Sequence, residues 1–131
     1  MNIKVWLTAF RLRTLPLAFS SIITGSAIAY YHFSFDALIF GLALLTTLFL
    51  QVLSNLANDY GDSEHGADND QRIGPDRAMQ TGAIRKKQMK TAMVLFSLFA
   101  LASGIPLIIE GTKNINLKWF LFFFALGVGS I

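Results

Sequence analysis

Three long stretches of the chain carry no charged side chain, and each is long enough to cross a membrane as a helix. They are Thr14–Tyr31 with 18 residues, Ala37–Ala57 with 21 and Thr91–Ile109 with 19. A helix rises about 1.5 Å per residue, so roughly 20 residues cross the ~30 Å hydrocarbon core of a bilayer. The pattern therefore predicts transmembrane helices over about residues 14–33, 37–58 and 91–110.

A fourth apolar run, Trp119–Ile131, predicts the start of a further span over about residues 117–131. Because the sequence stops there without a polar or basic exit, we expect residues 1–131 to be the N-terminal part of one larger domain. A re-entrant or interfacial C-terminus is the alternative. The predicted fold class is all-α, a polytopic transmembrane helical bundle with three full spans and the start of a fourth.

Composition supports a membrane environment. Hydrophobic residues make up 53% of the chain and charged residues 15%, whereas soluble domains average about 25% charged. The chain has no cysteine, which excludes disulfides and thiolate metal sites. The net charge is +3, but the basic residues flank the apolar spans and form no continuous stripe, so nucleic acid is not an expected partner. The expected partner is the lipid bilayer.

The basic residues are distributed unequally between the two sides of the predicted spans. Nine lie before the first span or between the second and third, and two lie after the third. Lys and Arg are enriched in cytoplasmic segments. We therefore expect a multi-pass protein of the cell inner (plasma) membrane, with the N-terminus and the loop 58–90 in the cytoplasm.

Polar residues follow one face of the second predicted span as it approaches that loop. Gln51, Asn55, Asn58 and Asp62 are spaced by four, three and four residues, with Asp59 beside them. Polar groups at membrane depth are costly and usually face a bundle interior or a wet cavity. This stripe predicts a cavity; pairing of Gln51 and Asn55 with another helix is the alternative.

The stripe leads into a cluster of acidic residues. Six of the chain's eight acids lie there: Asp59, Asp62, Glu64, Asp68, Asp70 and Asp76. Carboxylates crowd together unfavourably unless cations neutralise them, and oxygen ligands of this kind suit Mg²⁺, Ca²⁺ or Mn²⁺. Asp59 and Asp62, followed by Asp68, could hold Mg²⁺ against a diphosphate, with Arg72 and Arg77 near its oxygens. The alternative is a solvated charged loop.

The composite motif resembles the first aspartate-rich motif of the UbiA superfamily of membrane prenyltransferases. It comprises Asn58-Asp59-Tyr60-Gly61-Asp62, Gly66-Ala67-Asp68, Arg72-Ile73-Gly74-Pro75-Asp76-Arg77-Ala78 and Gln80-Thr81-Gly82. The segment Arg11–Pro16 resembles a short block before the first helix of the same enzymes. The third acid falls at Asp68, whereas much of the superfamily has it at the position of Gly66. This offset is similar to the 1,4-dihydroxy-2-naphthoate polyprenyltransferase branch.

The resemblance implies a larger helical bundle with a second aspartate-rich motif outside this chain. It implies Mg²⁺-dependent transfer of a polyprenyl group from polyprenyl diphosphate to 1,4-dihydroxy-2-naphthoate, giving demethylmenaquinol in menaquinone biosynthesis. We expect the 131-residue chain alone to be inactive. The alternatives are a UbiA-type prenyltransferase with another aromatic acceptor, a non-catalytic membrane fragment, and a transporter-like protein.

The same resemblance implies roles for individual residues. Asp59, Asp62 and Asp68 would face the metal, and Asp59 and Asp62 are the expected catalytic residues. The expected substrate-binding residues are Asn58 at the diphosphate, Arg72 and Arg77 as its clamp, Arg13 at the cavity mouth and Asn55 in the cavity lining.

Overall fold

The described part of the chain is helical. The computed structural model describes residues 3–64, 79, 82–113, 116, 118–119 and 122. The elements are α1 (Ile3–Phe10), the 3₁₀ turn η1 (Leu12–Thr14), α2 (Leu15–Tyr31), α3 (Ala37–Glu64) and α4 (Lys86–Thr112). Three helical stretches, Ile3–Tyr31, α3 and α4, are long and apolar enough to span a membrane. The predicted fold class, an all-α polytopic helical bundle, is confirmed.

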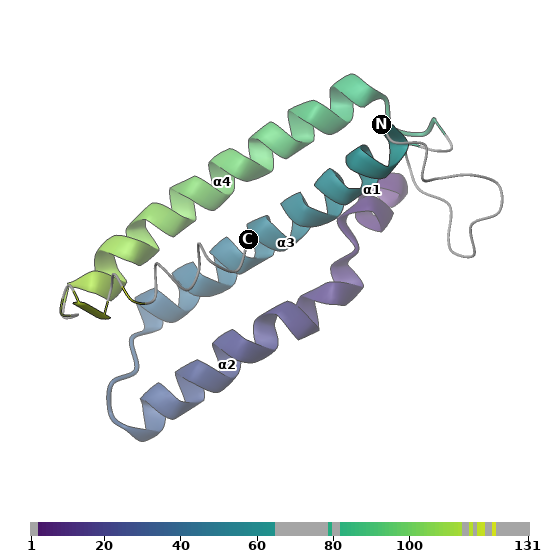
Figure 1. The fold of residues 1–131 in the computed structure, drawn as a ribbon. Helices are drawn as coiled ribbons and strands as arrows, with labels where there is room; N and C mark the ends of the chain where they lie inside the picture. Colours follow the sequence, from purple (N-terminus) through teal and green to yellow (C-terminus); the bar gives the residue numbers. More distant parts are fainter. Residues whose placement is uncertain are drawn as a thin grey trace.

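The start of the described chain, the end of α3 and the start of α4 lie together at one end of the helices (Figure 1). α3 and α4 run antiparallel along their length, and α2 packs on α3. α1 lies where α3 ends and α4 begins. We call this the Asp59 end, and the opposite end, where α2 connects to α3, the Asp36 end.

Local chemistry explains where the helices begin. At the start of α3, Asp36 Oδ1 accepts the N–H groups of Leu38 and Ile39 at 2.8 and 3.0 Å, as an N-cap does. At the start of α4, the Gln88 side chain accepts the Arg85 N–H at 3.0 Å. Pro16 lies in the first turn of α2, where a missing N–H breaks no helical hydrogen bond.

Two boundaries differ from the expected loop at 58–90. α3 continues to Glu64, so residues 58–64 are helical, and α4 begins at Lys86. Asp59 and Asp62 therefore both stand on α3. The predictions for Asp68, Arg72 and Arg77 lie outside the described residues, as does most of the predicted span at 117–131.

The main cluster of buried apolar residues is small and lies toward the Asp59 end, and Ala100 is buried apart from it on α4. The members of the cluster come from α1, α3, α4 and the segment before α4: Ala9, Val52, Leu56, Ile84 and Met89. Many apolar side chains of α2 and α4 are exposed instead, for example Leu17 at 81% and Leu101 at 57%. Such surfaces suit lipid or neighbouring helices, since apolar side chains gain little by leaving a hydrocarbon solvent.

Candidate functional site at the Asp59 end

α3 presents three polar side chains to the turn that joins α1 to α2. Gln51, Asn55 and Asp59 are spaced by four residues, which places them on one face of the helix. The segment that they contact, residues 10–14, is called the N-terminal turn below. All three side chains are at least partly removed from solvent, and Asp59 is only 2% exposed.

An ion pair forms the centre of this contact. The Arg11 guanidinium donates through Nη2 to Asp59 Oδ1 at 2.5 Å, across 48 residues of sequence. Charge-assisted bonds of this kind are shorter and stronger than neutral ones. The guanidinium also offsets the large cost of removing a carboxylate from water. Arg11 therefore fixes Asp59 in place while itself keeping 29% of its side chain exposed.

The side-chain amides of Asn55 and Gln51 bind the N-terminal turn at residues that lie before and after Arg11. Asn55 Nδ2 donates to the Phe10 carbonyl at 2.9 Å, and Gln51 Nε2 donates to Thr14 Oγ1 at 3.2 Å. The Thr14 hydroxyl in turn donates to the Arg11 carbonyl at 2.9 Å. Backbone carbonyls that leave a helix inside a membrane protein need such partners. The turn is thus fixed to α3 by side chains from both segments.

The backbone at Arg11 explains how its side chain reaches α3. Arg11 has φ 49° and ψ 49°, in the left-handed region. A residue with a Cβ there is uncommon, and the strain is of order 1–3 kcal/mol. The Asp59 ion pair and the bonds to the turn offset this strain. The reversal lets α1 pack on α3 while the guanidinium points at the carboxylate.

The predicted site residues that the structure describes differ in their burial and in their contacts. Asp59 is buried, Asp62 is partly buried one turn further along α3, and Asn58 is exposed. Asn55 is buried and donates to the N-terminal turn. This contact corresponds to the second alternative for Asn55, in which it pairs with another segment of the bundle. Arg13 is exposed, and it is Arg11 that contacts Asp59.

The donor chemistry on α3 fits a hard divalent cation. No group of three or more His, Cys, Asp or Glu side chains gathers among the residues that the structure describes. The end of α3 carries Asp59 and Asp62 on successive turns, and Glu64, which pairs with Lys86. Mg²⁺ commonly takes one or two protein carboxylates and completes its shell with water and phosphate oxygens. Asp59 and Asp62 could therefore serve as the protein ligands of such an ion.

Contacts between α3 and α4 close the same end of the bundle. Lys86 at the start of α4 forms an ion pair with Glu64 at the end of α3. Lys90 lies one turn later with its ammonium 5.4 Å from the centre of the Tyr60 ring, within cation–π range. The end of α3 that carries the acids is thus bordered by cations.

Two residues of this site, Arg11 and Thr14, were absent from the predicted site. Arg11 and Thr14 belong to the N-terminal block that the family resemblance quotes, but no role was attached to either. The available signal was the four-residue spacing of Gln51, Asn55 and Asp59, which places them on one helical face but does not by itself distinguish a partner segment from a cavity.

Comparison with known proteins identifies the family. The profile of the UbiA prenyltransferase family matches residues 18–131. The chain belongs to this family. Over 105 residues it is 48% identical to the 1,4-dihydroxy-2-naphthoate octaprenyltransferase of Escherichia coli (strain K12), a match that covers 80% of this chain and 34% of that protein.

Other UbiA-family relatives carry the same name. The 1,4-dihydroxy-2-naphthoate octaprenyltransferase of Haemophilus influenzae is 45% identical over 132 residues, covering 99% of this chain and 42% of the relative. That of Bacillus subtilis is 30% identical over 112 residues, covering 85% and 34%. The chain spans about a third to two-fifths of the length of these relatives. No solved structure matches it.

Proposed function

We propose that the full-length protein transfers a polyprenyl group from polyprenyl diphosphate to 1,4-dihydroxy-2-naphthoate, in a Mg²⁺-dependent step of menaquinone biosynthesis that yields demethylmenaquinol. Family membership and the two relatives at 45–48% identity support this reaction. The structural observation that carries it is Asp59, a buried carboxylate at the end of a membrane-length helix, held by Arg11.

In this proposal the acidic motif binds the metal and the diphosphate. Asp59, Asp62 and Asp68 would hold Mg²⁺, whose chemistry is to neutralise the charge that develops on departing diphosphate. Asn58 would hydrogen-bond the diphosphate, and Arg72 and Arg77 would clamp its oxygens. Such preorganised charge is usually the largest contribution to a reaction of this kind.

The contacts of the chain suggest a separate task for Arg11. Because it donates to Asp59 Oδ1, it fixes the orientation of that carboxylate and supplies a compensating charge in a buried position. Arg11 is therefore a positioning residue, and Asn55 and Gln51 support it by holding the turn on which it stands. Arg13, which is exposed, would attract anionic substrate at the cavity mouth.

We further propose that the Asp59 end faces the cytoplasm of a cell inner membrane. The nine basic residues of the N-terminal segment and of residues 58–90 support this orientation, since Lys and Arg are retained on the cytoplasmic side. The acceptor and the diphosphate would then enter from the aqueous cytoplasm, while the polyprenyl tail stays in the bilayer.

Membranes that contain the full-length protein provide the test. They are given 1,4-dihydroxy-2-naphthoate and radiolabelled octaprenyl diphosphate, with Mg²⁺ or with EDTA. Asp59→Asn and Asp62→Asn are each expected to lower product formation by about 100-fold or more, and EDTA to abolish it. The control is Asp36→Asn, which changes a carboxylate at the opposite end and should keep product formation within about twofold of wild type.

Three results would count against the proposal. Wild-type turnover in both aspartate variants would overturn their assignment, and full turnover in EDTA would overturn the metal dependence. Product from 4-hydroxybenzoate in place of the naphthoate would keep the chemistry but change the acceptor. The 131-residue chain alone is expected to give no product in the same assay.

A further inference from the structure

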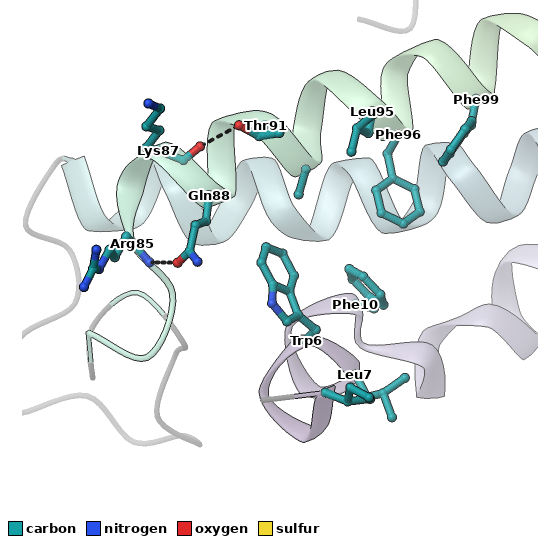
Figure 2. A pocket seen from close by; sticks show the side chains of 12 residues that line it. Trp6, Leu7, Phe10, Arg85, Lys87, Gln88, Thr91, Leu95, Phe96 and Phe99 are labelled. Carbon is teal, nitrogen blue, oxygen red and sulfur yellow. Dashed lines mark hydrogen bonds between the residues drawn. The ribbon is translucent and has the colours of Figure 1, made fainter. Parts of the chain in front are cut away.

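A groove of 660 Å³ lies between α1 and α4 at the Asp59 end (Figure 2). From α1, Ile3, Trp6, Leu7 and Phe10 line it, at the i, i+3, i+4, i+7 spacing of one helical face. α1 also packs on the core through Ala9, and Trp6 and Phe10 of the groove contact the same core. The apolar surface of α1 is thus divided between the core and the groove.

The α4 side of the groove changes from charged to polar to apolar along the helix. Its side chains include, in order, Arg85, Lys87, Gln88, Thr91, Phe96 and Phe99 (Figure 2). From Lys87 to Phe99 the helix advances by twelve residue steps, which correspond to about 18 Å. One leaflet of hydrocarbon is roughly 15 Å thick, half of the ~30 Å core. The gradient therefore matches a headgroup, a glycerol region and an acyl chain in one leaflet.

The two cations at the mouth of the groove are available for a ligand. Lys86, between them in sequence, pairs with Glu64, whereas Arg85 and Lys87 form no ion pair within the described ranges of the chain. No acidic side chain is among the described residues that line the groove. The mouth thus carries two cationic side chains, which point outward from the apolar lining at Trp6 and Phe96 (Figure 2).

We propose that this groove binds an anionic phospholipid. Its phosphate lies between Arg85 and Lys87, and one acyl chain runs along Trp6, Phe10 and Phe96. Charge complementarity selects this occupant, because anionic headgroups are attracted to basic residues at a membrane surface. A second copy seated here on a two-fold axis would instead bring the same two cations of each chain together, which is unfavourable.

The proposed lipid site is separate from the Asp59 contact. Neither Arg11 nor Asp59 lines the groove. Phe10 lies between them, because its carbonyl binds Asn55 while its ring stacks edge-on against Phe96, with centroids 5.2 Å apart. Lipid occupancy can therefore be measured without turnover, and the result does not depend on the proposed reaction.

Trp6 provides the readout. The full-length protein is reconstituted in phosphatidylcholine nanodiscs that contain increasing fractions of phosphatidylglycerol with brominated acyl chains, which quench nearby tryptophan. The Trp6 signal is the difference between wild type and Trp6→Phe. Half-maximal quenching is expected at an about tenfold lower mole fraction than with brominated phosphatidylcholine. The double variant Arg85→Gln/Lys87→Gln is expected to remove this preference.

Matched variants separate a site from a general field of positive charge. Lys90→Gln removes a cation from the same end of α4, but that side chain lies over Tyr60, and we expect at most an about twofold change. Arg85→Lys/Lys87→Arg keeps both charges and should retain the wild-type preference. Loss of the preference in this charge-retaining variant or in Lys90→Gln would overturn the assignment of Arg85 and Lys87 as the residues that bind the lipid phosphate.

Three results in wild-type protein would also overturn the proposal. Equal quenching by both brominated lipids would show that the groove does not select anionic headgroups. No quenching of Trp6 by either lipid would show that a protein segment or a second copy fills the groove. Relief of quenching by micromolar octaprenyl diphosphate would show that the groove admits the prenyl donor instead.

Discussion

The two ends of the bundle are held together in different ways. At the Asp59 end, side chains reach across the sequence: Arg11 to Asp59, Asn55 to the Phe10 carbonyl and Lys86 to Glu64. At the Asp36 end, the polar contacts are local. Asp36 caps its own helix, Ser34 donates to the Ala29 carbonyl, and Lys113 pairs with Glu110 three residues away.

Burial follows the same division. The five core residues lie at the Asp59 end, whereas Tyr31 and Phe33 near the Asp36 end are 78% and 100% exposed. In hydrocarbon, apolar burial drives helix association only weakly, so polar contacts and close packing decide where helices are joined. The comparison indicates that the tertiary structure of these helices is specified mainly at the end that carries the candidate site.

The largest expected effect is that of breaking the Arg11–Asp59 pair. In the full-length protein, Arg11→Gln removes the guanidinium that pairs with the buried Asp59 carboxylate, and we expect the free energy of unfolding to fall by about 3–5 kcal/mol. Chemical denaturation in detergent would measure this. Adding Asp59→Asn to the same chain should recover much of the loss, because a neutral amide costs less than a carboxylate to keep buried when the guanidinium is gone.

The ion pair at the other end is the matched control. Lys113→Gln removes an exposed pair with Glu110, which should change the unfolding free energy by less than about 0.5 kcal/mol. Similar losses for Arg11→Gln and Lys113→Gln would contradict the contrast between the two ends.

The second largest effect is expected from packing. Leu56 is fully buried beside Val52 and Met89, so Leu56→Ala should lower the unfolding free energy by about 3 kcal/mol through the cavity it creates. Leu38 on the same helix is 56% exposed near the Asp36 end, and Leu38→Ala should cost less than about 0.5 kcal/mol. Equal costs, measured by the same denaturation, would show that the buried core is not confined to one end.

A smaller effect is expected at Asn55. Asn55→Ala removes the donor to the Phe10 carbonyl, and a loss of about 1–2 kcal/mol follows if that carbonyl stays unpaired. Hydrogen exchange should rise in residues 5–14, which include the N-terminal turn, and stay unchanged in α4. Ser34→Ala, which removes a local bond at the Asp36 end, is the control. Faster exchange throughout the protein would contradict a local tie.

The sequence was sufficient to predict the fold but not the helix ends. Bilayer thickness sets how long an uncharged helix must be, so the absence of charge in Ala37–Ala57 located a span directly. The loop was placed from residue 58, where charged residues begin, although the spacing of the polar stripe indicated helix as far as Asp62, and α3 continues to Glu64. Polarity marks where a helix leaves hydrocarbon, and it does not mark where the helical backbone stops.

The site was predictable only in part. The motif and the helical spacing pointed to Asp59 and Asp62, and the contact of Asn55 was one of two alternatives. Arg11 was missed because its role depends on a left-handed backbone and on a partner 48 residues away. Asn58 and Asp59 lie three and four residues after Asn55, and both spacings continue the helical face of Gln51 and Asn55. Spacing alone therefore did not show which of the two faces the N-terminal turn. The roles of Asp68, Arg72 and Arg77 stay predictions.

The smallest expected effect tests the part of the bundle between the two ends. Thr46 of α3 donates to Ser103 Oγ of α4 at 3.0 Å, and an added Cβ on Gly104 would lie 3.4 Å from Thr46 Cγ2, so the helices approach closely here. Hydrogen bonds between membrane helices average about 0.6 kcal/mol, because each hydroxyl can also bond its own helix. The Leu42 carbonyl lies 2.8 Å from Thr46 Oγ1 and competes with Ser103 Oγ for the same hydroxyl proton. A double-mutant cycle of Thr46→Val and Ser103→Ala should therefore give a coupling of about 0.6 kcal/mol. A coupling as large as that of the Arg11–Asp59 pair would mean that the middle of the bundle joins α3 and α4 as strongly as the Asp59 end does.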